Sequence, residues 1–157
     1  MNNFIFKKSI TESQIDELIN YSITDPQIIK YTADQTRFGT RSAYNDWLDR
    51  KHPIIYTLSN KEANLCGLIW FEKDDSIEGC EYTFAIRLYA DARGKGLSFD
   101  FMKQSFDDLK PQSVWLKCSA DNIPANLTYQ KFGFKQITEP DENNKITFVL
   151  KNLPSQS

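Results

Sequence analysis

The chain has 157 residues, the length of one compact domain, with 40% hydrophobic residues, 25% charged residues and a formal net charge of −2. This charge argues against a nucleic-acid partner bound through the overall field of the protein. No apolar run approaches the roughly 20 residues of a transmembrane helix, so no membrane partner is expected. We predict a single domain over residues 1–152, followed by a short tail at 153–157.

Residues that bind metals or form disulfides are few. Three cysteines (Cys66, Cys80 and Cys118) are an odd number at long spacings, which match neither a disulfide framework nor paired metal ligands. The single histidine, His52, excludes a multi-histidine metal site, so no metal is expected. The first residues lack the pattern of a secretory signal. Free thiols without such a signal predict a cytoplasmic location.

The N-terminal part predicts one strand followed by helices. Residues 4–8 alternate like a short strand. Thr11 followed by Gln14 has the spacing of a capping box and predicts the start of a helix. Asp25 and Pro26 predict that a second, short helix begins directly afterwards.

The middle of the chain predicts a meander of strands. Residues 31–39 are expected to be irregular, and Thr40 to cap a helix that His52-Pro53 ends. Three strands are then expected, at residues 54–59, 65–72 and 80–89.

The C-terminal part alternates helices and strands. A helix is expected to open at the turn that begins with Arg93 and to close at Lys110-Pro111. The expected elements after it are a strand at 114–118, a helix at 124–132, and strands at 134–138 and 146–150. This order predicts an α/β (α+β) fold, with a mixed sheet covered by helices on both faces.

A glycine-rich turn reads Arg93-Gly94-Lys95-Gly96-Leu97-Ser98. The first turn of a helix leaves up to four backbone N–H groups free, and glycine lets a phosphate approach them closely. The glycine spacing excludes a Walker A loop, and the third glycine of the dinucleotide fingerprint would fall at Phe99. The turn alone is equally consistent with an anion site and with a tight turn that uses glycine only for its geometry.

A second motif follows one helix and one strand later, and here the chain resembles the GNAT superfamily of N-acetyltransferases. The family's second motif, Asn-x-x-Ala-x-x-x-Tyr-x-x-x-Gly-Phe, is matched at Asn122, Ala125, Tyr129, Gly133 and Phe134. Its first motif, Arg/Gln-x-x-Gly-x-Gly/Ala, is matched from Arg93 to Ser98, with serine at the last position. The two motifs stand in the family's order.

The resemblance implies a GNAT-like, mostly antiparallel sheet of six or seven strands with a splayed parallel pair. It also implies transfer of an acetyl group from acetyl-CoA to a primary amine, by direct attack in a ternary complex. The residues implied to bind acetyl-CoA are Ile86, Leu88, Arg93, Gly94, Lys95, Gly96, Leu97, Ser98, Asn122 and Tyr129. The backbone N–H of Leu88 is a candidate donor to the thioester carbonyl, where charge builds during attack.

Two residues are candidates for proton transfer. The resemblance implies that Tyr129 protonates the departing thiolate, which suits a phenol with a reference pKa of ~10. The alternative for Tyr129 is a core tyrosine whose hydroxyl has a local partner. Glu81 is the candidate base, because some family members carry a glutamate at the start of this strand. The alternative for Glu81 is a solvated charge near a strand end.

The acceptor wall is expected in the segment after the second helix, with Tyr31, Arg37 and Phe38 as candidate lining residues. Arg87 shares its predicted strand face with Glu81 and is a candidate for binding an acidic group of the acceptor. Lys117 occupies the position where acetylators of ribosomal-protein N-termini can carry a glutamate, which weakens that substrate interpretation.

Two other functions compete with this one. The first is a cofactor-binding module of the same fold that senses acyl-CoA without catalysis. The second, a phosphate- or nucleotide-binding domain, depends on the glycine turn alone. The sequence leaves open the amine acceptor, the acyl group and whether the protein is a monomer or a homodimer.

Overall fold

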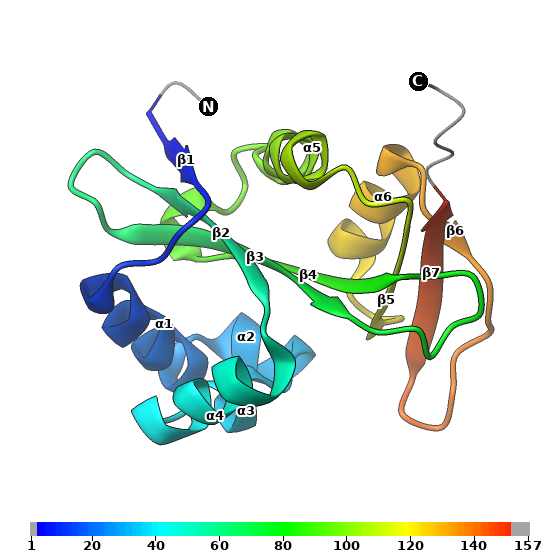
Figure 1. Cartoon of the computed structure of the whole chain (residues 1–157), viewed down its shortest axis with the longest axis horizontal. Helices are drawn as coiled ribbons and strands as arrows, with labels where there is room; N and C mark the ends of the chain where they lie inside the picture. Colours follow the sequence, from blue (N-terminus) through cyan, green and yellow to red (C-terminus); the bar gives the residue numbers. More distant parts are fainter. Residues whose placement is uncertain (1–2, 152–157) are drawn as a thin grey trace.

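A computed structural model describes residues 3–151. Within them the chain forms one seven-stranded mixed sheet in the order β1-β2-β3-β4-β5-β7-β6 (Figure 1). The strands are β1 (Ile5–Lys7), β2 (Ile54–Ser59), β3 (Leu65–Lys73), β4 (Tyr82–Leu88), β5 (Ser113–Ser119), β6 (Lys135–Gln136) and β7 (Lys145–Lys151). The helices are α1 (Glu12–Thr24), α2 (Pro26–Tyr31), α3 (Asp34–Arg37), α4 (Arg41–Lys51), α5 (Ser98–Leu109) and α6 (Ile123–Phe132). The tail expected at 153–157 lies outside the described residues.

The helix starts follow from their capping residues. The Thr11 hydroxyl accepts from the Gln14 backbone N–H, and the Gln14 side chain accepts from the Thr11 N–H, so the predicted capping box of α1 is confirmed. Asp25 caps α2, with Pro26 in its first turn. Thr40 caps α4 as predicted, through the Ala43 N–H.

The sheet opens at its centre, between β4 and β5. These two strands are parallel, whereas every other neighbouring pair in the sheet is antiparallel. They pair over two positions only, Tyr82 with Val114 and Thr83 with Trp115. Beyond this point β4 continues to Leu88 and β5 to Ser119 without pairing, so the strands diverge and leave backbone groups available between them. The predicted GNAT-like sheet with a splayed parallel pair is therefore confirmed.

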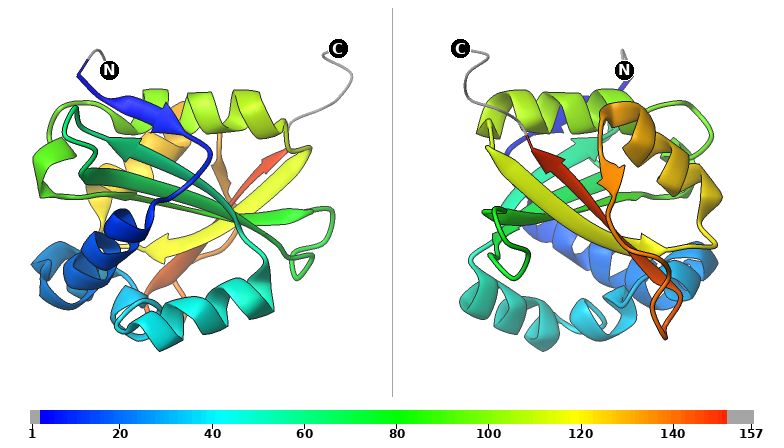
Figure 2. Two further views of the ribbon diagram at one scale, coloured as in Figure 1. Left: turned by 60° about the vertical axis from the view of Figure 1, so that its left-hand side comes forward. Right: turned by 90° about the vertical axis from the view of Figure 1, so that its right-hand side faces the viewer.

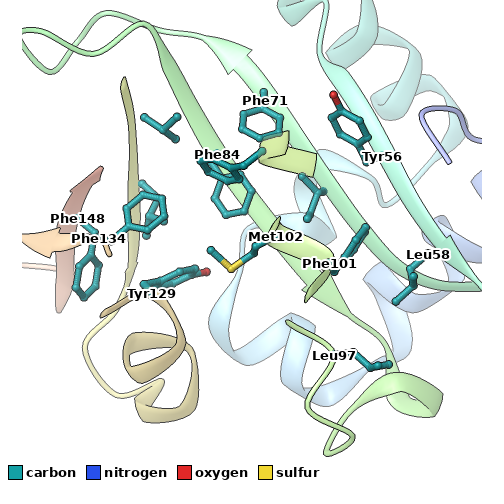
Figure 3. Close-up of a cluster of buried hydrophobic side chains, with 14 of the residues drawn as sticks. Tyr56, Leu58, Phe71, Phe84, Leu97, Phe101, Met102, Tyr129, Phe134 and Phe148 are labelled. Atoms are coloured by element: carbon teal, nitrogen blue, oxygen red, sulfur yellow. The ribbon is translucent and has the colours of Figure 1, made fainter. Parts of the chain in front are cut away.

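Helices cover both faces of the sheet. Helices α1 to α4 lie on one face, and α5 and α6 lie on the other (Figures 1 and 2). Side chains of β4 alternate between two apolar cores: Phe84 and Ile86 belong to the core under α5 and α6, and Ala85 to the core under α1 to α4. Figure 3 shows part of the larger core, in which the Tyr129 ring lies beside Phe134 and Phe148, with ring centroids 5.8 Å away in each case.

Several boundaries differ from the predicted ones. The segment expected to be irregular at 31–39 contains the single-turn helix α3, and the strand expected at 134–138 shortens to β6. The helix expected after the Arg93–Gly96 turn begins at Ser98 as predicted, because Gly94 and Gly96 adopt positive φ angles of 72° and 69° that a helix excludes. Within residues 3–151 no helix has the length and apolar character that a membrane crossing requires.

Candidate active site

A cavity of about 720 Å³ occupies the opening between β4 and β5. Its walls come from Thr83–Leu88 of β4, the second half of β5, the loop after β4, the start of α6, and the segment from α2 to α3. The cavity therefore reaches both faces of the sheet. A long, thin molecule that passes between the two strands would meet unpaired backbone in the middle of its path.

The loop after β4 can hold an anion. Within residues 3–151 no side chain caps the N-terminus of α5, so its first backbone N–H groups have no intrahelical or side-chain partner there. A Cβ atom added at Gly94 would meet no other heavy atom within 4 Å, and Gly94 and Ser98 both line the cavity. The loop thus offers free donors, open space and the positive end of a helix dipole, which together suit a diphosphate.

Arg93 connects this loop to the opposite wall. Its guanidinium donates to Asp25 Oδ2 at 2.7 Å, and Asp25 Oδ1 accepts from the Gln27 N–H at the start of α2. The ion pair is largely buried, with 25% of the Arg93 side chain and 6% of the Asp25 side chain exposed. The position of the glycine loop is therefore coupled to that of α2.

With CoA, the ligand that the sequence resemblance implies, Gly94→Ala is expected to lower the affinity by about tenfold or more, because a methyl group would occupy the space in which charge-assisted hydrogen bonds to phosphate would form. The matched control is Gly79→Ala, since Gly79 has a similar φ of 81° but lies outside the cavity. Both variants should lose about 1–2 kcal/mol of unfolding free energy, because alanine disfavours positive φ. Calorimetric titration with CoA checks the difference; equal affinities in the two variants would contradict an anion site at Gly94.

Tyr129 of α6 projects from the apolar core into the cavity. Its side chain is largely buried, and within residues 3–151 its hydroxyl makes no hydrogen bond. Burial raises the pKa of Tyr129 above its usual value; Cys118 adds to the rise and Arg87 opposes it. The phenol is therefore protonated at neutral pH, with its hydroxyl available to a bound molecule.

Cys118 lies beside Tyr129 but is held by a different group. Its thiol donates to Asn126 Oδ1 at 2.7 Å, and the Asn126 amide donates in turn to the backbone carbonyl of Ala120 at 3.2 Å. Burial raises the pKa of Cys118 to about 11. The thiol is therefore protonated, and hence a poor nucleophile, at neutral pH.

A buried ion-pair network forms the floor of the cavity on the α1–α4 side. Asp34 is fully buried and accepts from Arg87 Nε at 2.6 Å, from Arg87 Nη2 at 3.1 Å and from Arg37 Nη1 at 2.5 Å. Both guanidiniums lie over the Trp70 ring, at 4.9 Å for Arg87 and 5.2 Å for Arg37. Burial alone would raise the pKa of Asp34, but the two arginines more than offset it and hold the pKa below its usual value.

Glu72 is a cavity residue that the sequence analysis did not identify. It is 9% exposed, lines the cavity, and accepts from the Trp47 indole N–H at 2.7 Å through Oε2. Its strand position pairs with Thr83, directly where β4 and β5 begin to diverge. Glu72 therefore brings a carboxylate to the opening, on the same face as Trp70 and Arg87.

Comparison with known proteins identifies the family. A sequence profile of the Acetyltransferase (GNAT) family matches residues 16–134. The chain belongs to the GNAT acetyltransferase family. No curated protein sequence gives a significant match.

Solved GNAT structures share the fold of this chain. Spermidine N-acetyltransferase from Vibrio cholerae, in complex with CoA and spermine, superposes with a TM-score of 0.78 over 97% of each chain, at 15% identity. An N-acetyltransferase from Staphylococcus aureus Mu50 gives a TM-score of 0.72 over 95% of this chain and 98% of that one, at 17% identity. A dodecameric form of the Vibrio cholerae enzyme also matches, with a TM-score of 0.70 at 12% identity over 97% of this chain and 95% of that one. At these identities the likeness establishes the fold alone.

Most of the predicted site residues lie together in the cavity of this GNAT fold. Those that line it are Tyr31, Arg37, Ile86, Arg87, Leu88, Arg93, Gly94, Ser98, Asn122 and Tyr129. Three residues of the glycine turn do not line it: Lys95 lies over the Phe4 ring, Gly96 faces open space, and Leu97 is buried in the larger core. Their expected contact with the cofactor would have to come from the backbone.

Two further predicted residues, Glu81 and Phe38, also lie outside the cavity. Glu81 is exposed, and its backbone N–H and carboxylate bind the start of β5, at the paired end of the two strands rather than at the opening. Phe38 is fully buried and packs edge-on against Trp47 and Trp70, so it supports the cavity floor from below. Both residues were predicted from the family resemblance, which does not indicate where β4 and β5 separate in this chain.

Proposed function

We propose that this protein transfers an acetyl group from acetyl-CoA to a primary amine by direct attack in a ternary complex. The observation that carries the proposal is the presence, in one cavity, of a free anion-binding helix start, a gap between parallel strands and an unbonded tyrosine hydroxyl. Membership of the GNAT family supports the same chemistry.

The residues present fit acetyl-CoA. Gly94, Ser98 and the N-terminus of α5 would hold the diphosphate, and Asn122 would hold the cofactor from the loop before α6. The unpaired backbone of β4, including Ile86 and Leu88, would bind the amide groups of the pantetheine arm. Acetyl-CoA supplies a thioester carbonyl that is electrophilic toward a neutral amine.

Proton transfer needs one acid and one base. During the reaction a C–N bond forms, the C–S bond breaks, and the leaving thiolate takes a proton, for which Tyr129 is the donor that this cavity supplies. The attacking nitrogen must lose a proton, and Glu72 is the proposed acceptor, directly or through water. Glu81 was the candidate from sequence; its position at the paired end of the strands favours Glu72 instead.

Cys118→Ser is expected to keep turnover nearly unchanged, because direct attack needs no acetylated cysteine and serine keeps a donor to Asn126. Intact-mass measurement should also find no acetylated protein after incubation with acetyl-CoA in the absence of an amine. Acetylation at Cys118 together with loss of turnover in the variant would contradict direct attack in favour of a covalent intermediate.

The proposed function is tested by following release of the CoA thiol from acetyl-CoA over a panel of amino acids, peptides, polyamines and aminoglycosides. The expected result is thiol release that requires both the protein and an amine. Tight binding of CoA without thiol release across the panel would favour a non-catalytic acyl-CoA-binding module. Failure to bind CoA at millimolar concentration would contradict both functions.

A further inference from the structure

The cavity is rich in positive charge on the side that α1 to α4 cover. Arg37 and Arg87 lie in its floor. Lys117 and Lys145 line the opposite wall of the cavity. Cys118 of β5 packs into the core under α5 and α6, so its neighbours Lys117 and Ser119 point to the face that α1 to α4 cover. Lys145 pairs in register with Ser119 and therefore lies on that same face. Among residues 3–151 the one carboxylate that lines the cavity is Glu72, and Asp34 lies buried behind Arg37 and Arg87. A polyamine, which carries several positive charges, would meet like charge here.

The Arg37 guanidinium has N–H donors that no described contact uses. Arg87 uses three N–H groups on Asp34 and the Ile86 carbonyl, whereas the described contacts of Arg37 use one of its five, on Asp34. The Arg37 side chain is 31% exposed and lines the cavity. Its guanidinium carbon lies 5.2 Å from the Trp70 ring centroid and 5.7 Å from the Phe38 ring centroid, and these cation–π contacts help to hold it in place. The planar guanidinium, with unused N–H groups side by side, is suited to bind a carboxylate at two points.

Glu72 supplies the opposite charge in the same cavity. One of its oxygens accepts from Trp47, and within the described chain Glu72 forms no ion pair with Arg37 or with any other residue. The Glu72 carboxylate and the Arg37 guanidinium therefore line one cavity, where the charge of Glu72 acts on Arg37 without a direct ion pair between them. A ligand that carries both an amine and a carboxylate would satisfy both groups at once.

We propose that the acceptor is an amine that also bears a carboxylate, of which a free amino acid is the simplest example. Arg37 binds the carboxylate, and Glu72 faces the amine at the opening between β4 and β5. This inference rests on the proposed acetyl transfer and narrows its substrate class. It sets this chain apart from its structural neighbour that was solved with spermine.

The test compares matched acceptors in the wild-type protein with acetyl-CoA at saturation. Alanine, glutamate, lysine and 4-aminobutyrate are each measured against the corresponding carboxamide, which keeps the shape and removes the negative charge; spermidine is the polycationic comparator. For at least one pair, kcat/KM should be about tenfold to a hundredfold higher for the carboxylate, the range of a charge-assisted hydrogen-bonded contact.

Arg37→Gln should abolish this preference by raising KM for the carboxylate much more than KM for the carboxamide. Asp34 keeps its two bonds to Arg87 in this variant, so the fold is expected to survive. The matched control is Arg50→Gln, because Arg50 is an exposed arginine of α4 whose one ion pair among the described residues is with Asp46.

The outcomes are separable. Equal rates within every acceptor pair, or a preference for spermidine, would overturn the carboxylate inference and leave acetyl transfer standing. A preference that Arg37→Gln leaves unchanged would overturn the assignment of Arg37. No acetylation of any amine would overturn the proposed function, and this inference with it.

Discussion

Tyr129→Phe is expected to lower kcat by about 100-fold to 10,000-fold, the range for loss of a general acid, while the affinity for CoA stays nearly unchanged. The hydroxyl makes no hydrogen bond within the described residues, and the ring keeps its contacts with Phe134 and Phe148. The substitution therefore removes the proton donor and little else. Steady-state kinetics together with calorimetric titration of CoA measure the two effects separately.

Tyr56→Phe is the matched control. The buried Tyr56 donates to Asp108 at 2.8 Å, and it lies outside the cavity. This variant should lose about 1 kcal/mol of unfolding free energy and keep its turnover. If Tyr129→Phe turned over at the wild-type rate, Tyr129 would be removed from the mechanism.

The pH profile offers a further check on Tyr129. Because burial and Cys118 raise its pKa, the phenol stays protonated up to at least its ordinary value of about 10. The wild-type rate should therefore rise with pH as the acceptor amine loses its proton. Deprotonation of Tyr129 should not lower the rate at any pH below about 10. A falling limb near neutrality that Tyr129→Phe abolishes would contradict this assignment.

Asp34→Asn is expected to lower the free energy of unfolding by about 3–5 kcal/mol, because it leaves the buried Arg87 guanidinium without its counter-ion. The substitution preserves the shape of the side chain, so the loss of unfolding free energy measures the effect of removing the charge rather than a change in packing. Urea denaturation at neutral pH measures it. The matched control, Asp46→Asn, removes an exposed carboxylate that pairs with Arg50 in α4, and should change the stability little.

The effect of Asp34→Asn should also depend on pH. A carboxylate whose pKa is lower in the folded than in the unfolded chain stabilises the fold above its unfolded value of about 3.9. That contribution is lost as the pH falls through the folded value. The difference between wild type and variant should thus be complete near pH 6 and shrink below about pH 4. A difference that stays constant down to pH 3 would contradict a role for the Asp34 charge.

Local signals were enough to predict most of the fold. The capping box at Thr11, the Asp25-Pro26 pair and the glycines at 94 and 96 act within a few residues, so their effect can be read from the sequence. The single turn of α3 escaped prediction because a four-residue helix carries no periodic pattern. Asp34 in that turn can be buried because it pairs with Arg87 of β4 as well as with Arg37 of its own turn.

The site was predicted less completely, because it depends on strand register. Glu72 reaches the cavity because it pairs with Thr83 where β4 and β5 separate, and because Trp47 of α4 fixes its carboxylate. A glutamate at the end of a strand gives no local sign of either contact. Glu81, in contrast, shares the strand face predicted for Arg87 but lies at the paired end.

The central claim, acetyl transfer to an amine, is tested most directly by mass spectrometry of the reaction products. The protein is incubated with acetyl-CoA and amino acids, peptides, polyamines or aminoglycosides, and both products are quantified. We expect an N-acetylated amine and one free CoA for each acetyl group transferred, in amounts that Tyr129→Phe reduces. Binding of CoA without any acetylated amine across these acceptors would contradict the account.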